Sequence, residues 1–236
     1  MKNINIWLDQ IQNDYKAAVS VDCVIFGYDD QNLKILLSKC DMPPFENQFS
    51  LLGDIVHPNE TTDEAAYRVL VERTGISNIY LEQVQAFSAP NRHPLGRVIT
   101  ISYYSLIQID QTFLDHVAAH PDLILKSVNE VHTLAFDHKL IMDTCLTKLQ
   151  KNLREHPLGF KLLPSRFTLL QLQNLYESVL GITLDKRNFR RKMNTLGILK
   201  ESGEIESDVP HRPAKYYYFD ETAYHDRVEL GFSFGF

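Results

Sequence analysis

Residues 53–76, GDIVHPNETTDEAAYRVLVERTGI, carry the pattern that decides the fold of the N-terminal half. The first residues are extended in character, and Pro58 breaks that extended stretch. Thr61 stands three residues before Glu64, a spacing typical of the capping box that begins a helix, and Gly75 is a typical C-terminal stop. This part of the chain is therefore predicted to form a short strand, a loop and a capped helix.

The sequence on both sides of this stretch predicts further strands and helices. β-branched and aromatic residues over 19–28 indicate a strand, and a turn then leads into a second apolar strand. Alternating apolar and polar residues over 97–109 indicate a strand with one buried face. The predicted strands cover 19–28, 33–38, 50–56, 80–87 and 97–109, and a helix is predicted over 137–156.

The order of residues in 53–76 resembles the Nudix box. That pattern is a Gly, five residues, a Glu, seven residues, and then Arg-Glu-apolar-x-Glu-Glu-x-Gly-apolar. The matching residues are Glu60, Arg68, Leu70, Glu72, Gly75 and Ile76. The resemblance implies an α+β fold in which residues 1–157 form a Nudix-like α/β/α sandwich.

Departures from the Nudix box predict that the hydrolase chemistry has been lost. In the family, two carboxylates four residues apart on one helix face hold a divalent cation, and these positions are Val69 and Arg73 here. An aliphatic group cannot ligate a hard cation, and a guanidinium repels one. The opening glycine is also displaced, with Asp54 at its position, while the family's ion pair between Glu60 and Arg68 is expected to persist. We therefore predict no metal, no cofactor and no enzymatic activity. The alternative is an active hydrolase of a nucleoside diphosphate derivative such as ADP-ribose.

The loop over 88–97, SAPNRHPLGR, is predicted to bind a small-molecule effector. It gathers cations and hydrogen-bond donors between two strands, and loops held by a rigid sheet often carry binding residues. A pocket retained without cleavage chemistry favours recognition; the alternative is a domain that serves only for dimerisation. The predicted effector-binding residues are Asn91, Arg92, His93, Arg97 and Tyr103.

After Pro157 the pattern changes to short helices, which places a domain boundary between residues 157 and 158. Thr168 and Gly181 delimit one predicted helix, and Asp185 and Gly197 delimit the next. Two capped helices joined by a short turn indicate a helix-turn-helix. Two strand-like stretches around a polar tip follow, as in the wing of a winged helix.

The charge of this second part indicates a polyanionic partner. Residues 160–200 contain eight Lys or Arg and two Asp or Glu, a net +6 in a chain whose formal charge is -6. An apolar stripe of Phe189, Met193 and Leu196 leaves the Arg and Asn residues of the second helix free to reach base edges. The predicted DNA-binding residues are Thr168, Gln171, Lys186, Arg187, Asn188, Arg190, Arg191, Arg212 and Lys215, with His211 as a further wing residue.

Residues 162–200 also resemble the winged-helix domain of the Nudix-related transcriptional regulators. Members of that family are dimers whose Nudix-like domain binds an effector and thereby changes operator affinity. The resemblance implies a homodimeric regulator that binds double-stranded operator DNA through a winged helix over 158–236. Loss of both metal positions looks more like the sugar-responsive branch, including L-arabinose regulators of Bacteroidetes, than the branch that senses ADP-ribose. The implied effector is therefore a sugar or a sugar-nucleotide; a constitutive DNA-binding protein is the remaining alternative.

The composition adds an expectation about the cellular compartment. The N-terminus has scattered charges, and no apolar run reaches the roughly 18 residues of a membrane span. Three widely spaced cysteines suit neither a disulfide framework nor a zinc ribbon. We therefore expect a cytoplasmic protein without membrane contacts.

Overall fold

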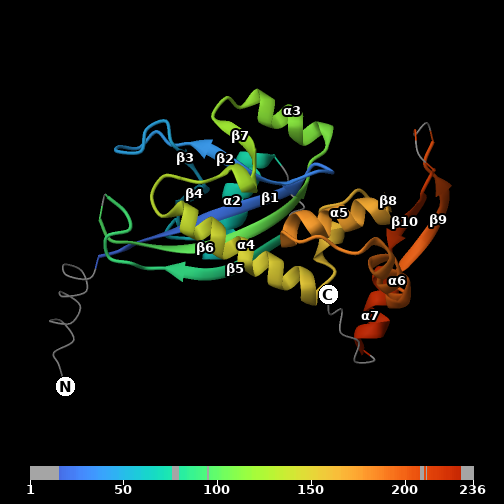
Figure 1. Cartoon of the computed structure of the whole chain (residues 1–236). Coiled ribbons are helices and arrows are strands. Elements are labelled where there is room, and N and C mark those ends of the chain that lie inside the picture. The colour runs from blue at the N-terminus through green and yellow to red at the C-terminus, as the bar shows by residue number, and fades with distance from the viewer. Residues whose placement is uncertain (1–15, 76–79, 95, 208–209, 211, 230–236) are drawn as a thin grey trace, which may run out of the picture.

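The computed structural model describes residues 16–75, 80–94, 96–207, 210 and 212–229. Its N-terminal part is built on a seven-stranded sheet in the order β3-β2-β1-β6-β5, with β4 paired to β1 and β7 paired to β2 (Figure 1). The parallel pairing of β1 and β6 forms the centre of this sheet. The strands are β1 Ala18–Tyr28, β2 Leu33–Lys39, β3 Phe49–Ser50, β4 Leu52–Ile55, β5 Tyr80–Phe87, β6 Val98–Gln108 and β7 Leu123–Ser127.

Two helices cover opposite faces of the sheet, which gives the predicted three layers. Alternate residues of β1 pack into two apolar clusters: Val21 and Ile25 contact the side of α2 (Thr62–Thr74), whereas Val24 and Phe26 contact the side of α4 (His138–Glu155). This alternation is the period-two pattern of a strand buried on both faces. The mixed α+β sandwich is thus confirmed.

The capping signals in the sequence mark the ends of α2 correctly. The backbone N–H of Glu64 donates to Thr61 Oγ1 at 3.2 Å, and the N–H of Thr61 donates to Glu64 Oε2 at 2.7 Å. Gly75 then ends the helix with a φ of 69°, a left-handed conformation that favours glycine. Helix α3 (Gln111–Ala119), strand β7 and the short helix η1 (Val128–Glu130) were not predicted.

The C-terminal part has the predicted helix-turn-helix and wing. A three-stranded sheet in the order β8-β10-β9 packs beside the helix pair. Helix α7, which follows β10, was not predicted. The elements are η2 Leu158–Lys161, β8 Phe167–Thr168, α5 Leu169–Leu180, α6 Lys186–Leu196, β9 Leu199–Ile205, β10 Lys215–Phe219 and α7 Glu221–Glu229.

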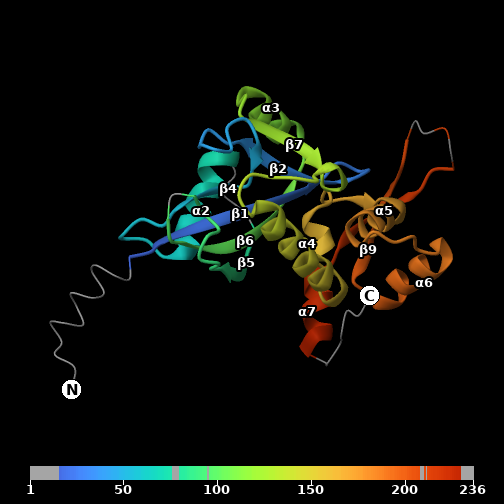
Figure 2. The same cartoon turned by 60° about the vertical axis from the view of Figure 1, so that its left-hand side comes forward.

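The apolar core continues across the predicted boundary between residues 157 and 158. One cluster of buried side chains extends from β1, β6 and α4 to α5 and α6. The ribbons of α4 and α5 lie side by side (Figure 2). Two hydrogen bonds reinforce the contact: Leu33 N–H donates to Ser178 Oγ at 2.8 Å, and Gln150 Nε2 donates to the carbonyl of Val179 at 2.9 Å. The N-terminal part and the helix-turn-helix are therefore in direct contact. Among the described residues, no helix combines the length and apolarity that crossing a bilayer requires.

Candidate functional site

Arg68 fastens the loop and helix formed by residues 53–76. Its Nη2 donates to Glu60 Oε1 at 2.8 Å, which confirms the expected ion pair, and its Nη1 donates to Asp54 Oδ2 at 2.8 Å. The same Nη1 lies 3.7 Å from Glu72 Oε2. The hydrogen bonds from Arg68 and from the backbone N–H of His57 lower the pKa of Glu60 to about 2. Three carboxylates thus share one guanidinium.

The two family positions for cation ligands have different surroundings. Val69 is 2% exposed and packs in the core between α2 and the sheet. The guanidinium of Arg73 lies 3.7 Å from the carboxylate of Asp122. Neither a buried aliphatic side chain nor a paired guanidinium is a ligand for Mg²⁺. The residues at these positions therefore do not fit the metal ion of Nudix chemistry.

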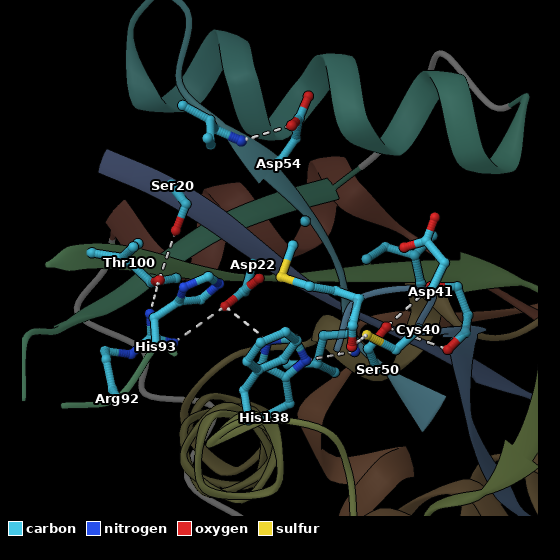
Figure 3. A pocket seen from close by; sticks show the side chains of 18 of the residues that line it. Ser20, Asp22, Cys40, Asp41, Ser50, Asp54, Arg92, His93, Thr100 and His138 are labelled. Carbon is cyan, nitrogen blue, oxygen red and sulfur yellow. Dashed lines mark hydrogen bonds and ion pairs between the residues drawn. The ribbon is translucent and has the colours of Figure 1, made fainter. Parts of the chain in front are cut away.

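A cavity of about 840 Å³ opens beside α2, at the end of the sheet where β1 begins and β2 ends (Figure 3). Its walls come from β1, β2, β4, β6, the loops over 40–47 and 92–97, and the start of α4. Cavities that hold small molecules typically measure roughly 300–1,000 Å³. The size therefore suits a ligand as large as a nucleotide.

A buried polar network forms the floor of the cavity (Figure 3). The side chain of Arg92 is 3% exposed, and its Nε and Nη2 donate to the two carboxylate oxygens of Asp137 at 2.8 and 2.6 Å. Arg92 Nη2 also lies 3.7 Å from Asp22 Oδ2, and Nη1 donates to Thr100 Oγ1, which is 2.7 Å from Ser20 Oγ. A buried guanidinium needs such partners, because its desolvation is costly without them.

His138, the first residue of α4, faces Asp22 from the other side. Its Nδ1 accepts the backbone N–H of Leu51 at 3.0 Å, which assigns the ring proton to Nε2. Nε2 lies 3.5 Å from Asp22 Oδ2. Burial raises the pKa of Asp22, while His138 and Arg92 act in the opposite direction. The cavity floor therefore holds a carboxylate between two nitrogen groups.

One wall of the cavity is aromatic. Phe136 stacks on His93 with ring centroids 5.0 Å apart and an interplanar angle of 7°, and its centroid also lies 5.0 Å from that of His138. Phe136 has a φ of 53°, which non-glycine residues rarely adopt. Strained backbone of this kind is often found at ligand sites.

The rim of the cavity carries both signs of charge. Asp41 and Glu46 line it, as do three cations, Lys39, Arg73 and Arg97. Arg73 is paired with Asp122, whereas Lys39 and Arg97 have no carboxylate partner in the part of the chain that the structure describes. These two cations can meet an anionic group of a ligand.

The helix-turn-helix presents a basic surface on α6. Phe189, Met193 and Leu196 are 3%, 0% and 7% exposed, so the predicted apolar stripe is confirmed. Asp185 begins the helix by accepting the N–H of Asn188 at 2.8 Å. The exposed polar residues of α6 include Lys186, Arg187, Asn188, Arg190 and Arg191.

Two of the predicted DNA-binding residues, Thr168 and Gln171, form the capping box at the start of α5. Thr168 is 2% exposed, and its hydroxyl accepts the N–H of Gln171 at 3.2 Å, while Gln171 Oε1 accepts the N–H of Thr168 at 2.8 Å. In the wing, Lys215 pairs with Glu201 at 2.8 Å, and Arg212 is exposed. His211 lies outside the described residues. Thr168 is not retained as a DNA contact, because its side chain is buried.

The comparisons with known proteins agree on one family. Residues 159–219 match the NrtR DNA-binding winged helix domain. Over 213 residues, the chain is 33% identical to the "ADPR responsive transcriptional repressor NtrR" of Acinetobacter baylyi, an alignment that covers 88% of this chain and 84% of that protein. This chain belongs to the NrtR family of Nudix-fold transcriptional regulators. It is therefore a DNA-binding regulator with a C-terminal winged helix.

Solved structures of the NrtR family support the same architecture. Shewanella oneidensis NrtR in complex with a 27mer DNA is 26% identical, with a TM-score of 0.77 over 87% of this chain and 94% of that one. Its Nudix domain in complex with ADP ribose is 25% identical, with a TM-score of 0.50 over 62% of this chain and 99% of that one.

Part of the chain is also similar in sequence to an enzyme. An ADP-ribose pyrophosphatase of Methanocaldococcus jannaschii is 32% identical over 125 residues, which cover 53% of this chain and 70% of the enzyme.

The structure brings three of the five predicted effector residues to the cavity: Arg92, His93 and Arg97. Asn91 is an exposed loop residue that does not line it. Tyr103 is buried on the α2 face, where its hydroxyl donates to Asp63 Oδ1 at 2.5 Å. Tyr103 therefore does not line this cavity, because strand alternation turns its ring toward α2.

The sequence analysis missed several cavity residues. Asp22 carried the clearest signal: it is a carboxylate within the otherwise apolar strand VSVDCVIFGY. Such a residue is rarely buried unless it has partners. Phe136 precedes α4 and His138 begins it, and the spacing of these residues in the sequence did not indicate a site. Ser20 and Thr100 lie on paired strands 80 residues apart, so only the fold brings them together.

Proposed function

We propose that this protein is a transcriptional repressor whose affinity for operator DNA changes when ADP-ribose binds in the cavity. The observation that carries the proposal is the near full-length relationship to a repressor described as ADP-ribose responsive. The cavity supplies suitable chemistry, with a buried polar floor and unpaired cations at the rim.

ADP-ribose fits the cavity better than the free sugar expected from the sequence. A pentose has no anionic group to use the cations Lys39 and Arg97, and it is small for a volume of about 840 Å³. The diphosphate of ADP-ribose can use these cations. Neither of the two curated relatives described above is named for a response to arabinose.

The proposal includes binding without cleavage. The buried Val69 and the paired Arg73 remove the two cation positions, and Arg68 engages the carboxylates of Asp54, Glu60 and Glu72. The runner-up function is hydrolysis of ADP-ribose, which the similarity to a pyrophosphatase favours. Incubation of the full chain with ADP-ribose and Mg²⁺, followed by measurement of AMP and ribose 5-phosphate, separates the two. We expect no turnover above buffer; turnover that Glu72→Gln abolishes would establish the enzyme.

The DNA half of the proposal places α6 in the major groove. Its exposed Arg and Asn side chains can make paired hydrogen bonds to guanine and adenine. We further propose a homodimer, so that two winged helices contact a palindromic operator. Light scattering of the free chain and of its DNA complex measures the number of copies.

Operator binding provides the decisive test. Selection from a random duplex library with the full chain yields an operator, and fluorescence anisotropy then gives its Kd in the presence of ADP-ribose, ADP or L-arabinose. We expect ADP-ribose to change the Kd and L-arabinose to leave it unchanged. A response to L-arabinose alone would refute ADP-ribose as the effector.

A further inference from the structure

Asp22 is a buried carboxylate with unmet hydrogen-bonding capacity. The whole residue is 6% exposed and its side chain 9% exposed, yet it lines the cavity. Its contacts with His138 and Arg92 measure 3.5 and 3.7 Å, and both reach the same oxygen, Oδ2. Among the residues that the structure describes, no donor forms a hydrogen bond with either oxygen of Asp22.

This arrangement is unusual for a buried carboxylate. Buried polar side chains nearly always have hydrogen-bond partners, and a specific exception requires an explanation. Gly53 lies opposite Asp22 in the pairing of β1 and β4, and its lack of a side chain lets Oδ1 approach closely, since a Cβ atom there would lie 2.2 Å from Oδ1. Both residues line the cavity, so the carboxylate stands at the cavity wall. A ligand with hydroxyl donors would complete its hydrogen bonds.

The chemistry of the groups around Asp22 indicates which part of the ligand binds there. A carboxylate repels phosphate but accepts hydrogen bonds from neighbouring hydroxyls, two at a time. Ser20 Oγ, on the same strand, adds a hydroxyl that can donate or accept. Cations available to phosphate lie instead at Lys39 and Arg97. The geometry therefore favours a polyhydroxylated ring at Asp22 and the diphosphate toward the rim.

We propose that Asp22 is the specificity-determining residue of the effector site and accepts hydrogen bonds from the vicinal hydroxyls of a ribose ring. The inference rests on the proposed function and names the part of the effector that is recognised. ADP-ribose contains two such rings, the terminal ribose and the ribose of adenosine. Both present the same chemistry, so the experiment must distinguish them.

The experiment measures binding to the full chain by calorimetry, with ADP-ribose, ADP and 2″-deoxy-ADP-ribose as probes. Asp22→Asn keeps the shape but removes the charge, so we expect ADP-ribose affinity to fall by about 10- to 100-fold, the usual worth of hydrogen bonds to a charged group. If the terminal ribose contacts Asp22, ADP affinity changes less than twofold; if the ribose of adenosine does, ADP loses as much as ADP-ribose. Asp143→Asn, a carboxylate on the exposed part of α4 outside the cavity, is the matched control.

Binding to the deoxy probe provides a second readout. If the terminal ribose contacts Asp22, we expect 2″-deoxy-ADP-ribose to bind the wild type more weakly than ADP-ribose does. In Asp22→Asn the two probes should bind with equal affinity. Should that variant fail to fold, Asp22→Glu, which keeps the charge but moves the carboxylate, replaces it, and the same loss of ADP-ribose affinity is expected. A folded Asp22→Asn chain that binds ADP-ribose within twofold of wild type overturns the role of Asp22. Wild-type protein that binds no ADP-ribose at all refutes the proposed function itself.

Discussion

Gly53 lies directly opposite Asp22 in the antiparallel pairing of β1 and β4, and a Cβ atom on Gly53 would come within 2.2 Å of Asp22 Oδ1. The same Cβ atom would lie 2.5 Å from the carbonyl oxygen of Val21. This glycine stands one residue before the opening position of the Nudix box, which Asp54 occupies. The displaced glycine is therefore required here by the carboxylate of the cavity floor.

Gly53→Ala is expected to disturb Asp22 and the backbone of β4 together. Added bulk in a packed site typically costs about 1–3 kcal/mol, so the melting temperature should fall. Affinity for ADP-ribose should fall as well, because Asp22 must move, whereas operator affinity without effector should remain. Thermal denaturation, calorimetry and anisotropy measure the three quantities. Unchanged stability and ADP-ribose affinity would show that the close approach is not maintained in solution.

Arg68→Ala is expected to change the acid sensitivity of the protein. The hydrogen bonds from Arg68 and, second, from the backbone N–H of His57 lower the pKa of Glu60 to about 2 in the folded state from an ordinary value of 4.5. A depressed carboxylate pKa stabilises the fold above the unfolded value, and this stabilisation is lost as pH falls from about 4.5 toward 2. The melting temperature of wild type should therefore exceed that of Arg68→Ala at pH 6, and the gap should narrow between pH 5 and pH 3. If the difference in melting temperature stays constant over this range, the ion pair between Arg68 and Glu60 is not its cause.

The sequence predicted those features of the fold and of the site whose patterns lie within a short stretch of the chain. The capping box at Thr61 and the spacing of Phe189, Met193 and Leu196 are local, and they placed α2 and the apolar stripe of α6 correctly. The cavity is non-local, because Asp22, Arg92 and His138 come from separate elements. Arg92 was predicted as an effector-binding cation of a loop, and it lines the cavity. Its burial against Asp137, 45 residues away, depends on the tertiary fold and could not be predicted. Thr168 was predicted as a DNA contact from its position at the start of a helix, whereas its burial, at 2% exposed, depends on the tertiary packing around α5.

Arg187→Ala and Arg190→Ala are each expected to weaken specific operator binding by about 1–3 kcal/mol, the worth of a paired hydrogen bond to a base. Both side chains are exposed on α6 beside the buried Phe189. Arg154→Ala removes an exposed arginine from the last turn of α4 and should leave binding unchanged. Anisotropy with the selected operator and with a scrambled duplex separates base recognition from general charge. Wild-type affinity in both α6 variants would remove α6 from the DNA interface.

Gln150→Ala is expected to uncouple the cavity from the winged helix. Helix α4 begins at the cavity with His138 and contacts α5 through Gln150, whose Nε2 donates to the carbonyl of Val179 at 2.9 Å. An effector changes DNA affinity only if the two states of the protein bind it differently, and a rigid helix joining both sites can carry that difference.

The variant should therefore bind ADP-ribose and free operator within about twofold of wild type, while the ratio of operator Kd values with and without ADP-ribose moves toward one. Couplings of this kind are typically about 1–3 kcal/mol, so the ratio in wild type is measurable by anisotropy. Lys151→Ala, at the next and exposed position of α4, is the control and should keep the wild-type ratio. An unchanged ratio in Gln150→Ala would show that ADP-ribose still alters operator affinity without this contact. The contact would then be excluded as the route of coupling between the two sites.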